Sequence, residues 1–112
     1  MGKKGDKLTQ AATEICAEVV ATLSPLGQVG SKKMFGGHGI FENGTMFALV
    51  DSAGDVFLKA AEANQARFEA AGSARHGRMP YFAVPVEVLE DADALRDWAK
   101  TSIEVAHNSK KK

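Results

Sequence analysis

Residues 34–50, MFGGHGIFENGTMFALV, are the part of this 112-residue chain that decides its fold. Asn43 and Gly44 stand between two apolar runs within it. This pair predicts a β-hairpin, because the two-residue turn that joins such strands needs positive φ at both central positions. The strands are then 38–42 and 45–50. The second strand is apolar without alternation, which favours a central strand covered on both faces.

Glycine is concentrated at the start of this hairpin. It lets the backbone form a bulge or pass close to a neighbouring strand. A phosphate-binding loop would need the glycines to open a helix, but here a strand and a tight turn follow them. A ligand-contacting loop remains the alternative. The glycines that we expect to be structural are Gly36, Gly37, Gly39 and Gly44.

Helical and extended patterns surround the hairpin. Apolar residues recur at helical period over 8–23, and two further helices are expected at 61–71 and 93–107. The sequence predicts an α+β fold, an antiparallel β-meander with helices on one face, in the order α-β-β-β-α-β-α. Extended segments are also expected at 28–35, which leads into the hairpin, at 56–59, and at 79–85, where two prolines favour a sheet edge.

Length and composition bound the class of protein. A chain of 112 residues forms one domain, expected at 8–107 between basic tails at 1–7 and 108–112. No apolar run approaches the roughly 20 residues of a membrane span, and the N-terminus lacks the apolar core of a secretory signal. The single cysteine, Cys16, excludes an internal disulfide. We therefore expect a cytoplasmic protein.

Charge is unevenly distributed although the formal net charge is zero. Six lysines lie in the tails, which leaves a charge of about −5 on residues 8–109. Because phosphate neutralisation supplies most of the affinity for duplex DNA, an acidic body argues against direct DNA binding. A nucleic-acid binder that uses the lysine tails and the basic residues of the body remains an alternative. The body residues expected to contact an anion or a partner are Lys32, Lys33, Arg75 and Arg78.

The residues that could carry catalysis do not form a recognisable constellation. His38, His76 and His107 fall in three different predicted elements, whereas a zinc site needs three or four converging ligands. Cys16 lies beside Ile15 on an apolar stripe, where a thiol is buried and inert. We expect no catalytic residues, no metal and no cofactor. A small-ligand or weak catalytic site at the glycine segment remains an alternative.

Several motifs, in order along the chain, resemble the TfoX N-terminal domain family. They begin with Met-Phe-Gly-Gly-x-Gly at 34–39 and the Asn-Gly turn. This resemblance implies an α+β fold similar to that of secretion chaperones. It also implies a role in regulating natural competence, in which the family's named members act with the cyclic-AMP receptor protein at promoters. The further matching segments are 46–50, 57–59, 68–72, 81–85, 88–91 and 95–99.

The resemblance sets the expected function. We expect a bacterial, non-enzymatic protein-interaction module in transcription regulation, with a protein partner and only indirect contact with nucleic acid. Whether the chain forms a homodimer is left open. Full competence regulators add a C-terminal helical domain, so a chain that ends at Lys112 is expected to be a stand-alone module. The loop 73–79 is shorter than in the family, which leaves open the loss of an edge strand.

Overall fold

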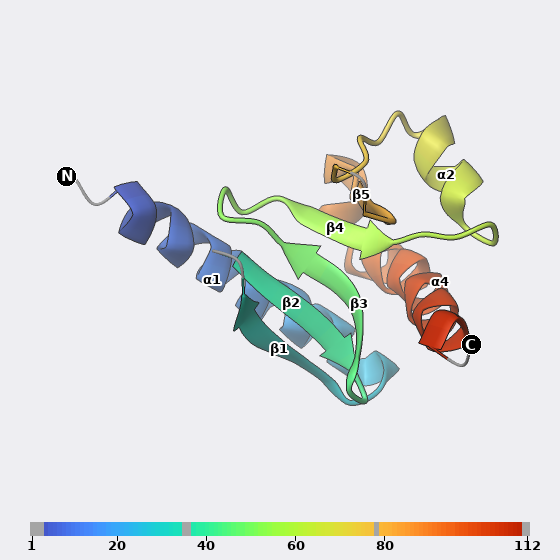
Figure 1. Ribbon diagram of the computed structural model, residues 1–112, viewed down its shortest axis with the longest axis horizontal. Coiled ribbons are helices and arrows are strands. Elements are labelled where there is room, and N and C mark those ends of the chain that lie inside the picture. Colours follow the sequence, from blue (N-terminus) through green and yellow to red (C-terminus); the bar gives the residue numbers. More distant parts are fainter. Residues whose placement is uncertain (1–3, 35–36, 78, 111–112) are drawn as a thin grey trace.

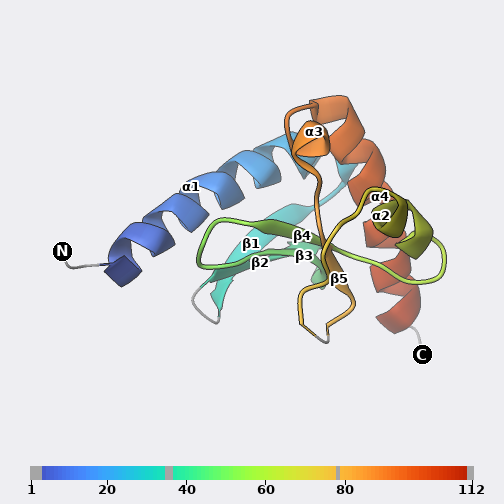
Figure 2. The same cartoon turned by 90° about the horizontal axis from the view of Figure 1, so that it is seen from above.

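The computed structural model describes residues 4–34, 37–77 and 79–110, and its fold is α+β. A five-stranded antiparallel sheet, in the order β1-β2-β3-β4-β5, has its helices on one face (Figures 1 and 2). The strands are β1 (Val29–Met34), β2 (Gly37–Glu42), β3 (Thr45–Val50), β4 (Val56–Lys59) and β5 (Tyr81–Ala83). The helices are α1 (Lys4–Leu23), the 3₁₀ turn η1 (Ser24–Leu26), α2 (Gln65–Ala70), α3 (Val86–Leu89) and α4 (Ala92–Lys110). The predicted α+β class and antiparallel meander are confirmed.

The element order differs from the prediction in two places. The extended segment before the hairpin is a full strand, β1, so four strands and not three precede α2. A short additional helix, α3, follows Pro85 and precedes α4. The Asp91 carboxylate then accepts the backbone N–H groups of Asp93 and Ala94 at 3.1 and 3.2 Å, which caps α4 and separates it from α3.

Two helix starts also differ from the prediction. Helix α1 begins at Lys4, inside the segment predicted as a basic tail. Helix α2 begins at Gln65 and not at residue 61. The Asn64 side chain explains the later start, because its Oδ1 accepts the Ala61 N–H at 2.8 Å and holds the preceding residues in a turn.

The central hairpin has the predicted two-residue turn. Glu42 pairs with Thr45, and the residues between them have positive φ, 51° at Asn43 and 86° at Gly44. The missing alternation in β3 has a cause that the sequence did not reveal. A bulge lies where the pairing passes from Ile40 with Ala48 to Phe41 with Met46, so Phe47 is the extra residue.

This bulge turns two consecutive side chains toward the helices, since Phe47 and Ala48 are both fully buried in the main core. Leu49 packs on the opposite face with Phe57 and Tyr81. β3 is therefore central and buried, as predicted. Its apolar run is uninterrupted because the bulge adds a side chain to the main core and the remaining side chains pack in the smaller cluster. Helices cover only one face of this strand (Figure 2).

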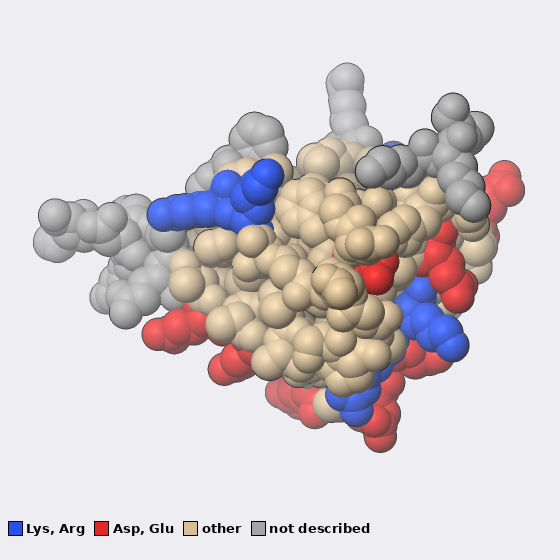
Figure 3. All heavy atoms as spheres, turned by 90° about the horizontal axis from the view of Figure 1, so that it is seen from below, with Lys and Arg blue, Asp and Glu red and all other residues tan. Residues whose placement is uncertain are grey.

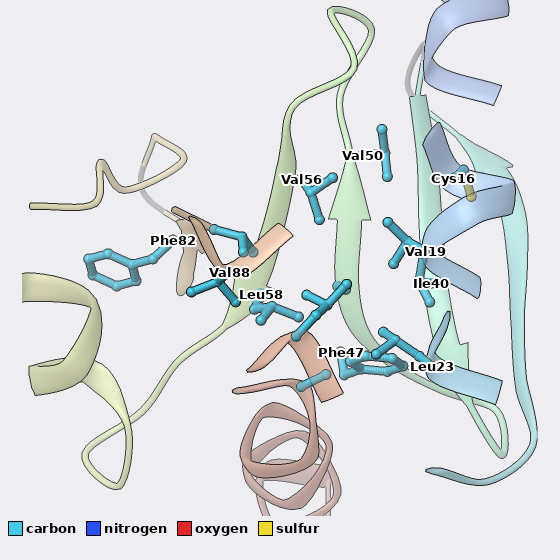
Figure 4. Close-up of a cluster of buried hydrophobic side chains, with 14 of the residues drawn as sticks. Cys16, Val19, Leu23, Ile40, Phe47, Val50, Val56, Leu58, Phe82 and Val88 are labelled. Carbon is cyan, nitrogen blue, oxygen red and sulfur yellow. The ribbon is translucent and has the colours of Figure 1, made fainter. Parts of the chain in front are cut away.

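The main core lies between the sheet and helices α1 and α4. Figure 4 shows Val19 and Leu23 of α1 directed toward Ile40 and Phe47 of the sheet, and Cys16 of α1 belongs to the same buried cluster. Cys16 is only 2% exposed, as expected of an inert buried thiol. None of the described helices is long and apolar enough to cross a membrane.

Candidate functional site

A pocket of about 460 Å³ opens on the sheet surface that faces away from the helices, which we call the helix-free face. Its place follows from Met46 and Leu49, which pack in the smaller cluster opposite the main core. Most of its lining side chains are apolar, and three are methionines. The lining residues are Met34, Gly37, His38, Met46, Leu49, Val50, Asp51, His76 and Met79.

Two of the predicted structural glycines shape this pocket. A Cβ at Gly39 would lie 2.7 Å from the Met34 sulfur and 3.2 Å from the Met46 sulfur, so both methionines lie over this glycine. A Cβ at Gly37 would collide with the carbonyl oxygen of Val50. Both positions show the close approach that glycine permits. Gly44 is needed for its turn, and Gly36 lies outside the described residues.

The methionines make the pocket adaptable. Their side chains are unbranched and polarisable, so they can repack around groups of different shape. Met79 is 41% exposed, so it is accessible from solvent. It reaches the pocket from the loop before β5, whereas Met34 and Met46 come from β1 and β3.

His76 forms part of the wall beside this loop. Its ring packs edge-on against Phe57, with the ring centroids 4.6 Å apart and the planes at 76°. The ring nitrogen Nδ1 is buried and has no hydrogen-bond partner among the described residues. A buried polar atom in this state is costly, so the wall of the pocket carries unused hydrogen-bonding capacity.

The two other polar side chains of the lining are already engaged. Asp51 Oδ1 accepts the N–H groups of Ala53 and Asp55 at 3.0 and 2.9 Å, which holds the β3–β4 turn. His38 Nε2 lies 3.1 Å from the Thr13 hydroxyl of α1. Both side chains therefore stabilise the fold through these contacts, and they also line the pocket.

The predicted basic residues do not come together. Lys32 and Lys33 are exposed on β1, and the Lys32 Nζ lies 6.0 Å from the centre of the Phe41 ring. The Arg75 Nε donates to the Met79 carbonyl at 3.0 Å, beside β5 at the opposite edge of the sheet. Four strand spacings of about 4.8 Å separate these edges by roughly 19 Å. Arg78 lies outside the described residues.

The three histidines are also separate. His38 contacts α1, His76 packs on β4, and His107 of α4 lies 2.6 Å from the Glu42 carboxylate of β2. Within residues 4–34, 37–77 and 79–110, no three His, Cys, Asp or Glu side chains are grouped so that they could hold a metal ion.

Charged side chains are unevenly distributed on the side of the molecule that Figure 3 shows. In this view, most acidic side chains lie along the lower and right borders of a broad area of mainly uncharged residues, and Lys and Arg side chains lie at its margins.

About half of this site was predictable from the sequence. The glycine segment that contains Met34 and Gly39 was selected, whereas the loop 73–79 was expected to be a solvated loop or to contact an anion or a partner through its arginines. The loop instead folds back along β5. His76 N–H donates to the Tyr81 carbonyl at 2.8 Å, and Ala83 N–H donates to the Ala74 carbonyl at 2.9 Å. The sequence held one indication that this loop belongs to the site, which is the apolar Met79 at the end of a polar segment.

These features define a small α+β domain with one helix-covered sheet face and one helix-free face that holds an apolar pocket. The sequence profile of the TfoX N-terminal domain matches residues 21–106 of the chain. The chain therefore belongs to the TfoX N-terminal domain family. The match begins near the end of α1 and includes the whole sheet. A comparison with curated proteins finds no match.

Proposed function

We propose that this chain is a non-enzymatic protein-interaction module that acts in transcription regulation by binding a protein partner on its helix-free face. The observation that carries the proposal is the methionine-lined pocket on that face. A surface of flexible methionines binds by packing and accommodates varied side chains. Met79 is partly exposed at the pocket, where a partner would reach it.

The chemistry of the lining supports binding over catalysis. Asp51 accepts turn amides, and His38 contacts the hydroxyl of Thr13. General acid–base catalysis needs such groups directed at a substrate. Cys16, the single thiol, is buried in the main core away from this pocket.

Family membership supports the regulatory part of the proposal. A cytoplasmic module of this family would act on transcription through a protein such as the cyclic-AMP receptor protein, with nucleic acid contacted through that partner. The acidic body is consistent with this division of roles, since residues 8–109 carry a charge of about −5.

Site-directed photo-crosslinking tests this proposal in cells that express the chain. A benzoylphenylalanine at Met79 should form protein adducts that survive nuclease treatment. The matched control is Val86, which is 64% exposed on α3 and does not line the pocket. Equal adducts from both positions, or adducts removed by nuclease, would contradict the proposal. The purified cyclic-AMP receptor protein provides a defined partner for the same assay.

The pocket volume supports a second candidate function, a small apolar ligand. Small-molecule sites occupy about 300–1,000 Å³, and this pocket of about 460 Å³ lies in that range. Native mass spectrometry of the protein purified from cells would reveal a bound compound as a discrete added mass. A Met46→Ala variant should lose that mass, and the same mass retained in Met46→Ala would place the compound elsewhere.

A further inference from the structure

The sheet has unequal edges. At β5, the returning loop bridges Arg75 to Phe82 and adds the two backbone hydrogen bonds described above. At β1, the only strand pairing within the described residues is with β2 (Figure 1). An unprotected strand edge presents backbone donors and acceptors to another chain. β1 is therefore the edge at which a further strand can be added.

The pairing of β1 with β2 determines which of its backbone groups face outward. The Asn43 N–H donates to the Gln28 carbonyl at 2.9 Å, and these residues continue the register in which Val29 pairs with Glu42. Hydrogen-bonded and non-bonded pairs alternate in an antiparallel ladder. The backbone N–H and C=O groups of Gly30 and Lys32 are therefore hydrogen-bonded to β2. Those of Ser31 and Lys33 point to the open edge.

The charges on this edge select the kind of strand that fits. Neither Lys32 nor Lys33 forms an ion pair with a described residue, and both are exposed. Like charges on facing strands are destabilising, so two copies of β1 would repel each other. A strand that carries carboxylates would instead be attracted, and the acidic remainder of the body would direct it to this edge.

The edge is continuous with the pocket. Met34 is the last residue of β1 and also lines the pocket. On the helix-free face, one cross-strand row runs through Lys32, Gly39, Leu49 and Phe57. Gly39 leaves a gap in this row, which the ends of the Met34, Phe41 and Met46 side chains occupy. A long apolar side chain on an added strand would lie beside Met34 and enter this gap.

We propose that the partner contributes an extended acidic segment, which pairs with β1 as a sixth strand and places an apolar side chain in the methionine pocket. This inference rests on the proposed function and specifies its mode of binding. Backbone pairing supplies affinity in such complexes, and side-chain pockets supply specificity. Gly30 leaves room for a partner side chain as well, because nothing lies within 4 Å of a Cβ built there.

Selection of peptides from a random display library on the full chain provides the probe. Enriched peptides should combine acidic residues with at least one long apolar residue. Ser31→Pro removes one outward N–H while preserving the bonds to β2, and should abolish their binding. Ser31→Ala is the matched control, because it removes the same hydroxyl and keeps the N–H. Lys32→Glu with Lys33→Glu should weaken binding about tenfold at low salt and less at high salt.

Hydrogen exchange on the complex gives an independent readout. The bound peptide should slow exchange of the Ser31 and Lys33 amides by about tenfold or more, while the Lys32 amide changes little.

Three results would overturn the inference. One is the absence of enriched peptides, and another is enrichment of basic peptides. The third is binding that survives Ser31→Pro. If that surviving binding is lost in Met79→Ala, the proposed function stands and the strand addition is wrong.

Discussion

Gly37 and Gly39 occupy similar positions in the sequence but face different neighbours. A Cβ at Gly37 would meet the backbone of Val50 and Asp51, which cannot move without displacing β3. A Cβ at Gly39 would meet the ends of Met34, Phe41 and Met46, two of which are flexible. The same substitution should therefore have different effects at the two sites.

Thermal melts of Gly37→Ala and Gly39→Ala test this difference. Overpacking costs about 1–3 kcal/mol, and for a small domain each kcal/mol lowers the melting temperature by roughly 4–8 °C. The loss of stability should lie near the upper limit of this range for Gly37→Ala. For Gly39→Ala it should lie near or below the lower limit. Gly39→Ala should also narrow the pocket and weaken partner binding. A Gly39→Ala variant that melts lower than Gly37→Ala would show that the methionines are held rigidly.

Tyr81 provides a prediction that depends on pH. Burial raises the pKa of this phenol above its ordinary value of 10.0. As pH rises, the unfolded chain loses the phenol proton before the native protein does. The contribution of Tyr81 to stability is therefore complete below pH 10 and declines as pH rises through the native pKa.

Absorbance titration of the phenolate should place the midpoint of this single tyrosine above that of a free tyrosine amide. Urea unfolding should show a loss of stability as pH rises above about 10 that is smaller in Tyr81→Phe. A native midpoint at or below pH 10 would contradict the buried position of the hydroxyl.

At the scale of elements, a polar cluster joins β4, α2 and α4. The Lys59 carbonyl accepts the Ser102 hydroxyl at 2.8 Å and the Asn64 Nδ2 at 3.1 Å. Asn64 and Ser102 are 4% and 0% exposed. A buried carbonyl that loses its donors costs about 1–3 kcal/mol, so these side chains hold the end of β4 against α4.

Asn64→Ala should lower the free energy of unfolding by about 1–3 kcal/mol, and Ser102→Ala should act in the same direction. The exposed Ser52→Ala, in the β3–β4 turn, is the control and should change stability little. Urea denaturation of the three variants measures the differences. An Asn64→Ala protein as stable as the parent would mean that other contacts hold α2, such as Phe68, which packs on Phe82 and Trp98.

Elements with local causes were predictable from the sequence. The hairpin depends on Asn43 and Gly44, and helix α1 on its apolar stripe, so each is encoded by neighbouring residues. The bulge at Phe47 and the return of the loop 73–79 depend on pairing with Ile40 and with β5. The same distinction applies to the pocket. Met34 and Gly39 lie in the segment that the sequence singled out, whereas His76 comes close to them only in the tertiary structure.

At the scale of the whole molecule, Cys16 reports on the integrity of the fold. Its thiol is enclosed between α1 and the sheet (Figure 4). A thiol reagent should therefore react only when α1 separates from the sheet or the domain unfolds. Labelling in a urea series should increase together with the loss of helical circular dichroism. Rapid labelling without urea would contradict the packing of α1, and Cys16→Ala provides the baseline for nonspecific reaction.

The limits of the family match and the limits of the folding unit are different. The match starts at residue 21, but Cys16 and Val19 lie before it and cover Ile40 and its neighbours in the sheet. A recombinant fragment trimmed to the family boundaries would expose this apolar sheet surface to solvent and would be expected to precipitate or associate. An expressed fragment should therefore include the whole of α1. Poor solubility of a trimmed fragment would reflect the loss of the α1 side chains that cover the sheet.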